Sequence, residues 1–592
     1  MSNIRSPGVY YERIEERLPP LELGPTGQVA FLGMATRGPV GIPQRLTSYD
    51  DFLDQYGAPL KYGFLSDSVE GFFKNGGRVC YVVRVAHTAG SRAGVGAGET
   101  EEIATRASAV VENRQGTPTL RVQARSEGDW GNDIQVNLSV PAPKTQTLLV
   151  RDAAEGDNRV SVRTGRGFRV GTLCRLHDGK TERYMTVSHV EGKELYWTEP
   201  LDVGFKSSAP TFIEPITLEI EAQMPGYKER FQDLDFSPAS TRNYERYVNA
   251  ESQIIELKPQ AVAGQWPDKL PKDAHRLRLE GGLDGLQHLT PSDFIGENSG
   301  PGRRFGLGAL EVLDDIDLVA IPDLYPALER GFRSIRSVEV VQNAVLDQCE
   351  RLKDRFALLD MPPGAPFETA LQWRMLFDSA FGAFYYPWMV VPQEGRRRRV
   401  VPPCGHVAGV IARCDAEMGV HNPPANEIIE GVVDMDVLLN DDHLGQLNHE
   451  GINCIKYTQA RGIRIWGART LSSDPSWRYV NVRRIFNAVR RALEHGTQWV
   501  VFEPNAPPLW QQISRNLGTF LEQLWLKGYF QGQVAAEGFY VVCNGETNPP
   551  ELVETGTLVC EIGLAPVRPA EFITFRVSQQ MEDRATGDFS AE

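Results

Sequence analysis

The chain has 592 residues, with 77 acidic and 62 basic side chains, which gives a formal charge of −15 at pH 7. The length predicts roughly three to four domains, and the composition, 41% hydrophobic and 23% charged, is typical of globular proteins and excludes collagen-like and disordered chains. The negative charge argues against nucleic-acid binding, because that binding depends on Lys and Arg displacing counterions from phosphates.

Two further classes are disfavoured by the sequence. Residues 1–20 contain no apolar core of the kind found in secretory signals, and no window reaches about 18 uninterrupted apolar residues. The eight cysteines form no C-x-x-C pair, and several stand inside apolar runs, as reduced thiols of cytosolic proteins do. We therefore expect a protein made in a reducing compartment, with no direct membrane insertion.

The first predicted element is a short strand, VYYERI, between prolines. One side of the strand carries Tyr10, Glu12 and Ile14, and the other carries Val9 and Tyr11. A strand isolated in this way is not stable alone, so it must pair with another part of its own chain or with another chain.

Residues 27–88 indicate a compact α/β segment. QVAFLGMA and RVCYVVRV are typical of buried strands, and between them SYDDFLDQYG and SDSVEGFFKNG are typical of helices. The first helix begins with a Ser/Asp cap and ends at Gly57. From about residue 89 to 290 short alternating runs such as TLRVQARS and ITLEIEA replace this pattern, which predicts one or two inserted β-rich domains.

The α/β pattern returns at about residue 309 and becomes most regular after residue 452. We expect a helix that starts at Asp474-Pro475 and ends at Gly496, a strand TQWVVFE, and a second amphipathic helix over 509–527. GFYVVCN, TLVCEIGLA and EFITFRVS are predicted as closing strands. In the last of these, one side carries Ile573, Phe575 and Val577, and the other carries Phe572.

These elements predict an α/β (α+β) multidomain fold, in which helices cover mixed sheets and a β-rich outer domain is inserted. The predicted parts are an N-terminal arm, the N-terminal part of the core, the insertion, an α/β domain, a C-terminal domain and a C-terminal arm strand with tail, at residues 1–25, 26–88, 89–290, 291–450, 451–570 and 571–592.

No common catalytic signature is present, and we predict no catalytic, cofactor-binding or metal-binding residues. Gly179-Lys180-Thr181 resembles the end of a phosphate-binding loop, but Cys174 stands where the first glycine is required, so a hairpin turn is expected instead. His443 and His449 near Asp441 leave a metallohydrolase as an alternative, although their spacing places them on different sides of a helix.

Three other groups of polar residues are interpreted as structural. Cys404 and His406 are too close in sequence to form a nucleophile and base without help from the fold. The acidic residues at 314, 315 and 317 are expected at a helix end and in a solvated loop. The run Arg396–Arg399 lacks interleaved aromatic residues, which favours a solvated loop or a contact with an acidic partner surface.

About half of the chain resembles the tail sheath proteins of contractile phage tails and contractile injection systems. The N-terminal resemblance includes SPGVYYERIE and VAFLGMATRGPVGIPQRLTSYDDFLDQYG, and the C-terminal one includes VPPCGHVAGVIARCDAEMGVHNPPANE, RGIRIWGARTLSSDPSWRYVNVRR and LVCEIGLAPVRPAEFITFRV. The segments follow one another in family order at residues 6–15, 29–57, 72–85, 385–391, 401–427, 447–457, 461–484, 496–505 and 558–577. No motif of the family is found in residues 89–290, where sheath proteins carry variable outer insertions.

The resemblance implies a non-enzymatic structural subunit that polymerises helically around an inner tube and contracts to drive the tube through a target envelope. Its partners would be further copies of itself, the inner tube protein, and baseplate and terminator or cap proteins, with no cofactor and no nucleic acid. It would assemble in the bacterial cytoplasm and become part of a phage tail or injection-system particle. A tail terminator or baseplate component with the same C-terminal fold is the alternative.

The resemblance also suggests which residues make contacts between chains. The strands at Val9–Ile14 and Glu571–Ser578 would be exchanged between subunits, because an added strand bonds to a sheet edge through its main chain. On the helix over 509–527, Arg515, Glu522 and Lys527 lie off the apolar face and are candidates for facing the tube.

Overall fold

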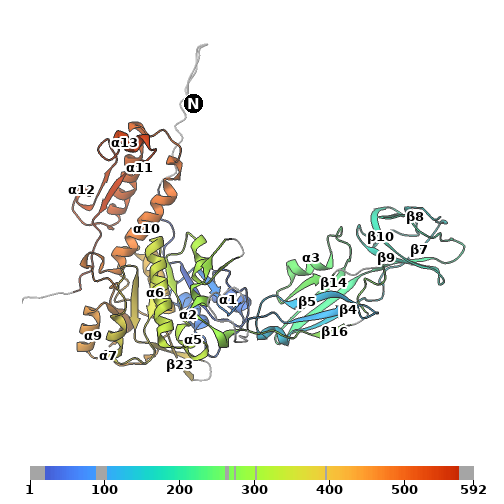
Figure 1. Ribbon diagram of the computed structural model, residues 1–592, viewed down its shortest axis with the longest axis horizontal. Helices are drawn as coiled ribbons and strands as arrows, with labels where there is room; N and C mark the ends of the chain where they lie inside the picture. Colours follow the sequence, from blue (N-terminus) through green and yellow to red (C-terminus); the bar gives the residue numbers. More distant parts are fainter. Residues whose placement is uncertain are drawn as a thin grey trace, which may run out of the picture.

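The computed structural model describes residues 21–88, 103–260, 266–272, 275–300, 303–393 and 397–571. The molecule is elongated (Figure 1): a helix-covered core carries a C-terminal helical unit above it in this view, and two β-rich units extend one after the other to the right. In the described ranges, no helix is long and apolar enough to cross a membrane.

The core is built on one sheet of eight strands, and its six middle strands are parallel. The short edge strands at both ends run antiparallel to their neighbours. In sheet order the strands are β2 (Gln44–Leu46), β3 (Cys80–Arg84), β1 (Val29–Gly33), β19 (Leu318–Ala320), β20 (Phe356–Asp360), β21 (Gly382–Tyr386), β25 (Ile452–Thr458) and β26 (Gly462–Trp466). Strands β3, β1, β19, β20 and β21 are buried along their whole length, as parallel strands covered on both faces must be.

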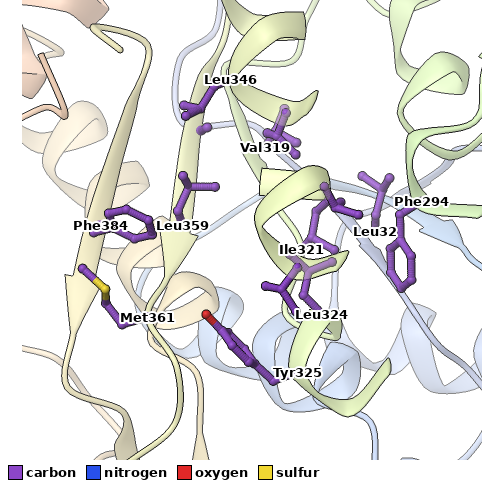
Figure 2. Close-up of a cluster of buried hydrophobic side chains, with 14 of the residues drawn as sticks. Leu32, Phe294, Val319, Ile321, Leu324, Tyr325, Leu346, Leu359, Met361 and Phe384 are labelled. Atoms are coloured by element: carbon purple, nitrogen blue, oxygen red, sulfur yellow. The ribbon is translucent and has the colours of Figure 1, made fainter. Parts of the chain in front are cut away.

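Helices cover both faces of this sheet and enclose two apolar clusters. One face carries α1 (Tyr49–Tyr56), α2 (Leu65–Lys74) and α8 (Cys404–Glu417). The other carries α4 (Pro291–Ile295), α5 (Leu324–Arg330), α6 (Ile335–Leu352), α7 (Phe367–Arg374) and α9 (Asp441–His449). Figure 2 shows the second cluster, in which Leu32, Val319, Leu359 and Phe384 from neighbouring strands meet Leu324 and Leu346 from the helices.

The predicted helix after the first strand is confirmed. Ser48 caps α1 by accepting a hydrogen bond from the Asp51 amide, and the helix ends at Gly57, whose φ of 80° favours glycine.

Two buried carboxylates at the ends of neighbouring strands hold the starts of two helices. Asp323, just after β19, accepts hydrogen bonds from the amides of Met34 and Phe64, the residue before α2, at 2.6 and 2.5 Å. Asp360, the last residue of β20, accepts one from the amide of Cys404, the first residue of α8, at 3.0 Å. Burial raises the pKa of each carboxylate to about 7.

The predicted β-rich insertion forms two units. The unit next to the core packs a three-stranded sheet against a four-stranded sheet around one apolar cluster, with the short helix α3 (Tyr244–Glu251). In sheet order the strands are β15 (Ile255–Pro259), β5 (Pro118–Ala124) and β4 (Ser108–Glu112), and then β14 (Tyr227–Leu234), β13 (Leu218–Met224), β6 (Gln135–Ser139) and β16 (His275–Arg278).

The distal unit is a closed barrel of six strands. In order they are β7 (Thr147–Leu148), β12 (Phe212–Ile216), β9 (Leu173–His177), β10 (Glu182–Glu191), β11 (Glu194–Trp197) and β8 (Arg159–Ser161). Residues just beyond the first and last strands pair with each other, since Leu149 bridges Val162 and the Val150 amide donates to the Ser161 carbonyl at 2.9 Å. The predicted hairpin turn at Gly179-Lys180-Thr181 joins β9 to β10.

The C-terminal unit rises from the core on a long helix. Its elements are α10 (Val480–Gly496), α11 (Pro507–Leu526), α12 (Ala535–Gly538), β27 (Phe539–Val542), α13 (Pro550–Glu554) and β28 (Glu561–Leu564). The helix predicted to start at Asp474-Pro475 begins instead as a 3-10 turn over Pro475–Trp477, followed by α10. The strand predicted for TQWVVFE is wrong: Gln498–Val500 form a 3-10 turn, and Phe502 is fully exposed.

The remaining strands are short. A two-stranded pair joins β17 (Glu297–Asn298) and β18 (Arg304–Phe305), and a three-stranded sheet joins β23 (Arg397–Val401), β22 (Met389–Gln393) and β24 (Asp434–Met435).

Candidate functional site

Among the described residues, the C-terminal unit contains a sheet of two strands. β27 and β28 pair antiparallel, with Phe539 opposite Leu564 and Val541 opposite Ile562. These four side chains pack against the apolar cluster that lines α10 and α11, yet each stays only partly buried. An isolated pair of strands is marginal in water, so this sheet depends on the helices behind it and gains from any strand added beside it.

Both outer edges of this sheet lack a partner strand in the described part of the chain. The Ala565 amide donates to the Gly538 carbonyl at 2.8 Å, which makes these two residues a hydrogen-bonded pair at the end of the ladder. Hydrogen-bonded and non-hydrogen-bonded pairs alternate along two antiparallel strands. Tyr540 and Val542 stand two and four residues from Gly538, so they too are in hydrogen-bonded pairs and direct their main-chain N–H and C=O groups toward β28. Val541 and Ile562 therefore direct theirs outward, where an added strand would bond.

On the outer face of the sheet, an aromatic ring packs over a glycine of the opposite strand. Tyr540 lies opposite Gly563, and a Cβ atom on Gly563 would come within 2.0 Å of the Tyr540 ring. Tyr540 keeps 56% of its surface exposed, so the ring covers the glycine and still faces solvent.

Glu571, the last described residue, is held by an ion pair and hydrogen bonds. The Arg469 Nε atom lies 2.9 Å from Glu571 Oε1, and a second guanidinium nitrogen lies 2.5 Å from Oε2. The Tyr479 hydroxyl donates to the same carboxylate at 3.3 Å. Burial alone would raise the pKa of Glu571, but the hydrogen bonds and charge of Arg469 lower it below its ordinary value. The arm residues Phe572, Ile573, Phe575 and Val577 lie outside the described residues.

The first described residue, Leu21, lies at the C-terminal end of α10, whereas Glu571 lies near its start. Leu21 belongs to the apolar cluster of the C-terminal unit and touches Gly496, the last residue of α10, where a Cβ atom would overlap the Leu21 side chain. Tyr479, which contacts Glu571, directly precedes α10. A helix of 17 residues is about 25 Å long, so these two ends of the described chain lie about that far apart. Arm residues Val9, Tyr10, Tyr11, Glu12 and Ile14 also lie outside the described residues.

Helix α10 is fixed to the core by a buried ionic cluster. Arg484 contacts Asp317, which precedes β19, and donates to Asp415 of α8 at 2.9 Å. The Gly27 amide donates to Asp317 at 2.9 Å, and Arg491 lies 3.6 Å from it. Against the effect of burial, the charges of Arg484 and Arg491 lower the pKa of Asp317. Asp317 was expected in a solvated loop and is instead buried.

The other members of that acidic run behave differently. The Asp315 carboxylate accepts a hydrogen bond from the Tyr81 hydroxyl at 2.6 Å, which ties it to β3. Asp314 is exposed, as expected.

The charged residues predicted to face the tube are all on the surface. Arg515 and Glu522 are exposed on α11, and Lys527 follows the last residue of that helix and is exposed as well. The helix is amphipathic, as predicted, and its buried side includes Ile513, Leu517, Phe520, Leu521 and Leu524.

The residues considered for a metal site are not brought together. The His443 ring stacks on Phe367 with the ring centroids 4.6 Å apart, while the His449 carbonyl accepts from Arg469. Within the described ranges, no group of three or more His, Cys, Asp or Glu side chains is placed to hold a metal.

Cys404 and His406 do not form a reactive pair. Both are buried in the first turn of α8, with the His406 ring close against Gly71 of α2. Burial raises the pKa of Cys404 and lowers the pKa of His406 to about 4, so both side chains are uncharged at neutral pH.

The arginine run is only partly a solvated loop, which corrects the prediction. Arg397, Arg398 and Arg399 belong to β23, and Arg396 lies outside the described residues. The Arg399 guanidinium lies over the Phe64 ring and 3.5 Å from Asp67, so this residue stabilises the core.

Comparison with known proteins shows which family has this architecture. The model of the phage tail sheath protein central domain matches residues 336–471, and that of the phage tail sheath C-terminal domain matches residues 472–580. A prophage major tail sheath protein of Pseudomonas aeruginosa (strain UCBPP-PA14) is 28% identical over 294 residues, which cover 48% of this chain and 72% of that protein. The chain spans between 26% and 61% of four further curated tail sheath proteins.

Two solved structures complete the comparison. A chain of the anti-feeding prophage baseplate is 32% identical, with 46% of this chain and 74% of that chain covered and a TM-score of 0.40. The helical sheath of the anti-feeding prophage in its contracted state is 19% identical, with 97% and 99% covered and a TM-score of 0.51, which shows the same fold. The chain therefore belongs to the tail sheath protein family of contractile phage tails and injection systems.

Proposed function

We propose that this chain is the repeating subunit of a contractile sheath. It polymerises helically around an inner tube and contracts to drive that tube through a target envelope. The observation that carries the proposal is the two-stranded sheet β27–β28, whose two outer edges have no partner strand among the described residues. With it go Leu21 and Glu571, which lie at opposite ends of α10 and from which the predicted arms continue.

Strand addition supplies the contacts between subunits. An extended arm from a neighbour that pairs with Val541 or Ile562 bonds through its main chain and fixes the direction of the next subunit. Such a contact joins two different surfaces, so it propagates as an open helix when the rotation does not close a ring. Two arms and two edges in each subunit are sufficient for a continuous mesh.

The same arrangement lets neighbours stay joined while each body turns. The arms are held at their roots by Arg469 and by the cluster around Leu21, and Arg484 fixes α10 to the core. The subunit therefore rotates as one body between arms that remain attached. We infer that assembly stores the energy for contraction, in two packings that differ by about a few kcal/mol per subunit, without nucleotide hydrolysis.

The inner tube meets the exposed face of α11 in this proposal, through Arg515, Glu522 and Lys527. Exposed ion pairs contribute at most about 1 kcal/mol each, which suits a surface that must release the tube during contraction. Baseplate and terminator proteins would start and stop the polymer, and assembly takes place in the bacterial cytoplasm.

A proline scan of β27 tests strand addition directly. Val541→Pro removes an amide that points away from β28, so the subunit still folds, but a neighbour's arm cannot pair with that edge. Tyr540→Pro removes an amide that bonds to β28 and serves as the control that damages the unit itself.

The readout is negative-stain electron microscopy of the protein expressed alone in a bacterial cytoplasm. The unmodified chain should form hollow ridged tubes, and Val541→Pro and deletion of residues 1–20 should each leave folded monomers. Normal long tubes from both variants would contradict strand exchange. Single rings from the unmodified chain, also in the presence of tube protein, would favour a terminator or baseplate component.

A further inference from the structure

The two-stranded sheet ends in a pair of cysteines. Cys543 directly follows β27 and Cys560 directly precedes β28. The last pair of the ladder is Val542 with Glu561, so the next position places Cys543 opposite Cys560.

The hydrogen-bonding pattern of the two strands places this pair at a position that suits a disulfide bond. Ala565 and Gly538 are a hydrogen-bonded pair, so alternation makes the Cys543 and Cys560 position non-hydrogen-bonded. Opposite residues at such positions have Cα atoms about 4.5 Å apart, within the range of about 4.4 to 6.8 Å that disulfides require. Their side chains also share a face, because both lie two residues from the inward-facing pair Val541 and Ile562.

Cys543 and Cys560 are more exposed to solvent than the other six cysteines. Cys560 is partly exposed and Cys543 is 7% exposed, whereas each of the other six cysteines is at most 2% exposed. The Cys543 sulfur accepts from the Asn548 side chain at 3.8 Å, and Asn548 also bonds the Val559 carbonyl and amide, which holds the two chain segments together. An oxidant in solution therefore reaches Cys560 first and finds Cys543 beside it.

We propose that Cys543 and Cys560 form a disulfide when the folded protein meets glutathione disulfide or a similar soluble disulfide. The Cys560 thiolate attacks one sulfur of the oxidant, which releases one glutathione thiolate and leaves glutathione bound to Cys560. The Cys543 thiolate then attacks the Cys560 sulfur, forms the protein disulfide and releases the second glutathione. Two protein thiols are oxidised and one glutathione disulfide is reduced to two glutathione molecules.

The reaction is slow at neutral pH and faster at higher pH, since the thiolate is the reacting form. Burial raises the pKa of Cys543, and burial and the neighbouring Cys543 raise the pKa of Cys560 to about 12. The pair thus stays reduced during synthesis in a reducing cytoplasm and is oxidised after prolonged contact with an oxidising medium. The bond would close a loop that contains α13 and link β27 to β28 covalently, without using either outer edge of the sheet.

Mass spectrometry of the full-length folded protein tests the proposal. Both cysteines lie in one tryptic peptide, residues 528–576, which contains no other cysteine and no other cleavable Lys or Arg. After incubation with glutathione disulfide at about pH 8.5, denaturation, alkylation and digestion, we expect this peptide without alkylation and lighter by two hydrogens than the dithiol form. The peptides of the other six cysteines should remain alkylated.

Two variants control the reaction. Cys543→Ser should retain glutathione on Cys560 as a mixed disulfide, and Cys560→Ser should leave Cys543 free for alkylation. Oxidised wild type should unfold thermally at a higher temperature than reduced wild type, and neither variant should show that shift. Recovery of wild type with both thiols alkylated, or with glutathione retained on Cys560 as in Cys543→Ser, would overturn the proposal.

Discussion

Arg469 holds Glu571 through both carboxylate oxygens, at 2.9 and 2.5 Å, at the last described residue, from which the predicted C-terminal arm continues. The same guanidinium donates to the carbonyls of Asn448 and His449, so the anchor is continuous with the end of α9 and with the core sheet behind it. A pull on the arm is therefore transmitted to the core.

Removing the Arg469–Glu571 ion pair should loosen the chain at Glu571, from which the predicted arm continues. Arg469→Met leaves the half-buried Glu571 without its cation, and we expect a loss of about 1–3 kcal/mol in the local free energy of opening. Limited proteolysis of the unassembled subunit should then cut the segment before Glu571 more rapidly, and long tubes should become rarer. Arg461→Met, at an exposed position in the turn between β25 and β26, is the matched control. Equal cleavage rates in both variants would show that the ion pair does not hold the arm.

Arg484 should be among the most sensitive positions of the C-terminal half. Arg484→Met leaves Asp415 buried without its cation and leaves Asp317 with Arg491 as its remaining cation, which costs about 3–5 kcal/mol. Denaturant unfolding should show the loss as a lower midpoint for the core and α10. Arg490→Met, exposed on the same helix, should change the free energy of unfolding by less than about 0.5 kcal/mol. A similar midpoint for the two variants would argue against a role of the cluster in fixing α10.

The two buried carboxylates at the strand ends predict a pH dependence. The pKa of Asp323 and of Asp360 is raised to about 7, against about 4 in an unfolded chain, so between these values the folded state binds protons that the unfolded state does not. By linkage, their contribution to the free energy of unfolding is fully present below about pH 4 and is lost as the pH rises through about 7.

Asp360→Asn tests this dependence. Asparagine can still accept the hydrogen bond from the Cys404 amide but does not titrate. We expect the stability of the variant relative to wild type to increase from pH 5 to pH 8 at constant ionic strength, measured by calorimetry. Parallel stability curves for the two proteins would show that Asp360 titrates at its ordinary pKa.

Charge reversal on α11 tests the tube-facing proposal. The double variant Arg515→Glu and Lys527→Glu changes exposed positions, so the subunit should fold with unchanged stability to within about 0.5 kcal/mol. Assembly around the tube protein should weaken, while tubes formed by the sheath protein alone should remain. Gln511→Glu and Gln512→Glu, exposed near the start of the same helix, add the same kind of charge elsewhere and serve as controls. Normal extended sheaths from the double variant would place the tube contact on another surface.

Local signals in the sequence were sufficient for many elements. Ser48 and Gly57 mark the ends of α1, and the apolar spacing of α11 specifies its buried side. The segment TQWVVFE failed because its β-branched and aromatic residues favour a strand, whereas the chain there must turn between two packed helices. Tertiary packing decided the outcome at that point.

Features that depend on distant partners could not be predicted. Asp317 is buried because Arg484, 167 residues further along, reaches it, and Arg399 turns inward because Asp67 lies beneath it. The strands β27 and β28 were expected, but a run of strand residues does not say how many neighbours a strand has. Only the fold shows that neither outer edge of this sheet has a partner strand in the part of the chain that the structure describes.

The distal barrel has a consequence for finished particles. Its six strands close on themselves, so it offers no free edge at the end of the molecule farthest from the C-terminal unit (Figure 1). We expect this insertion to lie on the outside of the particle. Adjacent filaments would then meet through strands whose backbone groups are already paired within each barrel. Crowded particles would then stay dispersed rather than bundle side by side, and cohesion would be confined to the interior of each polymer.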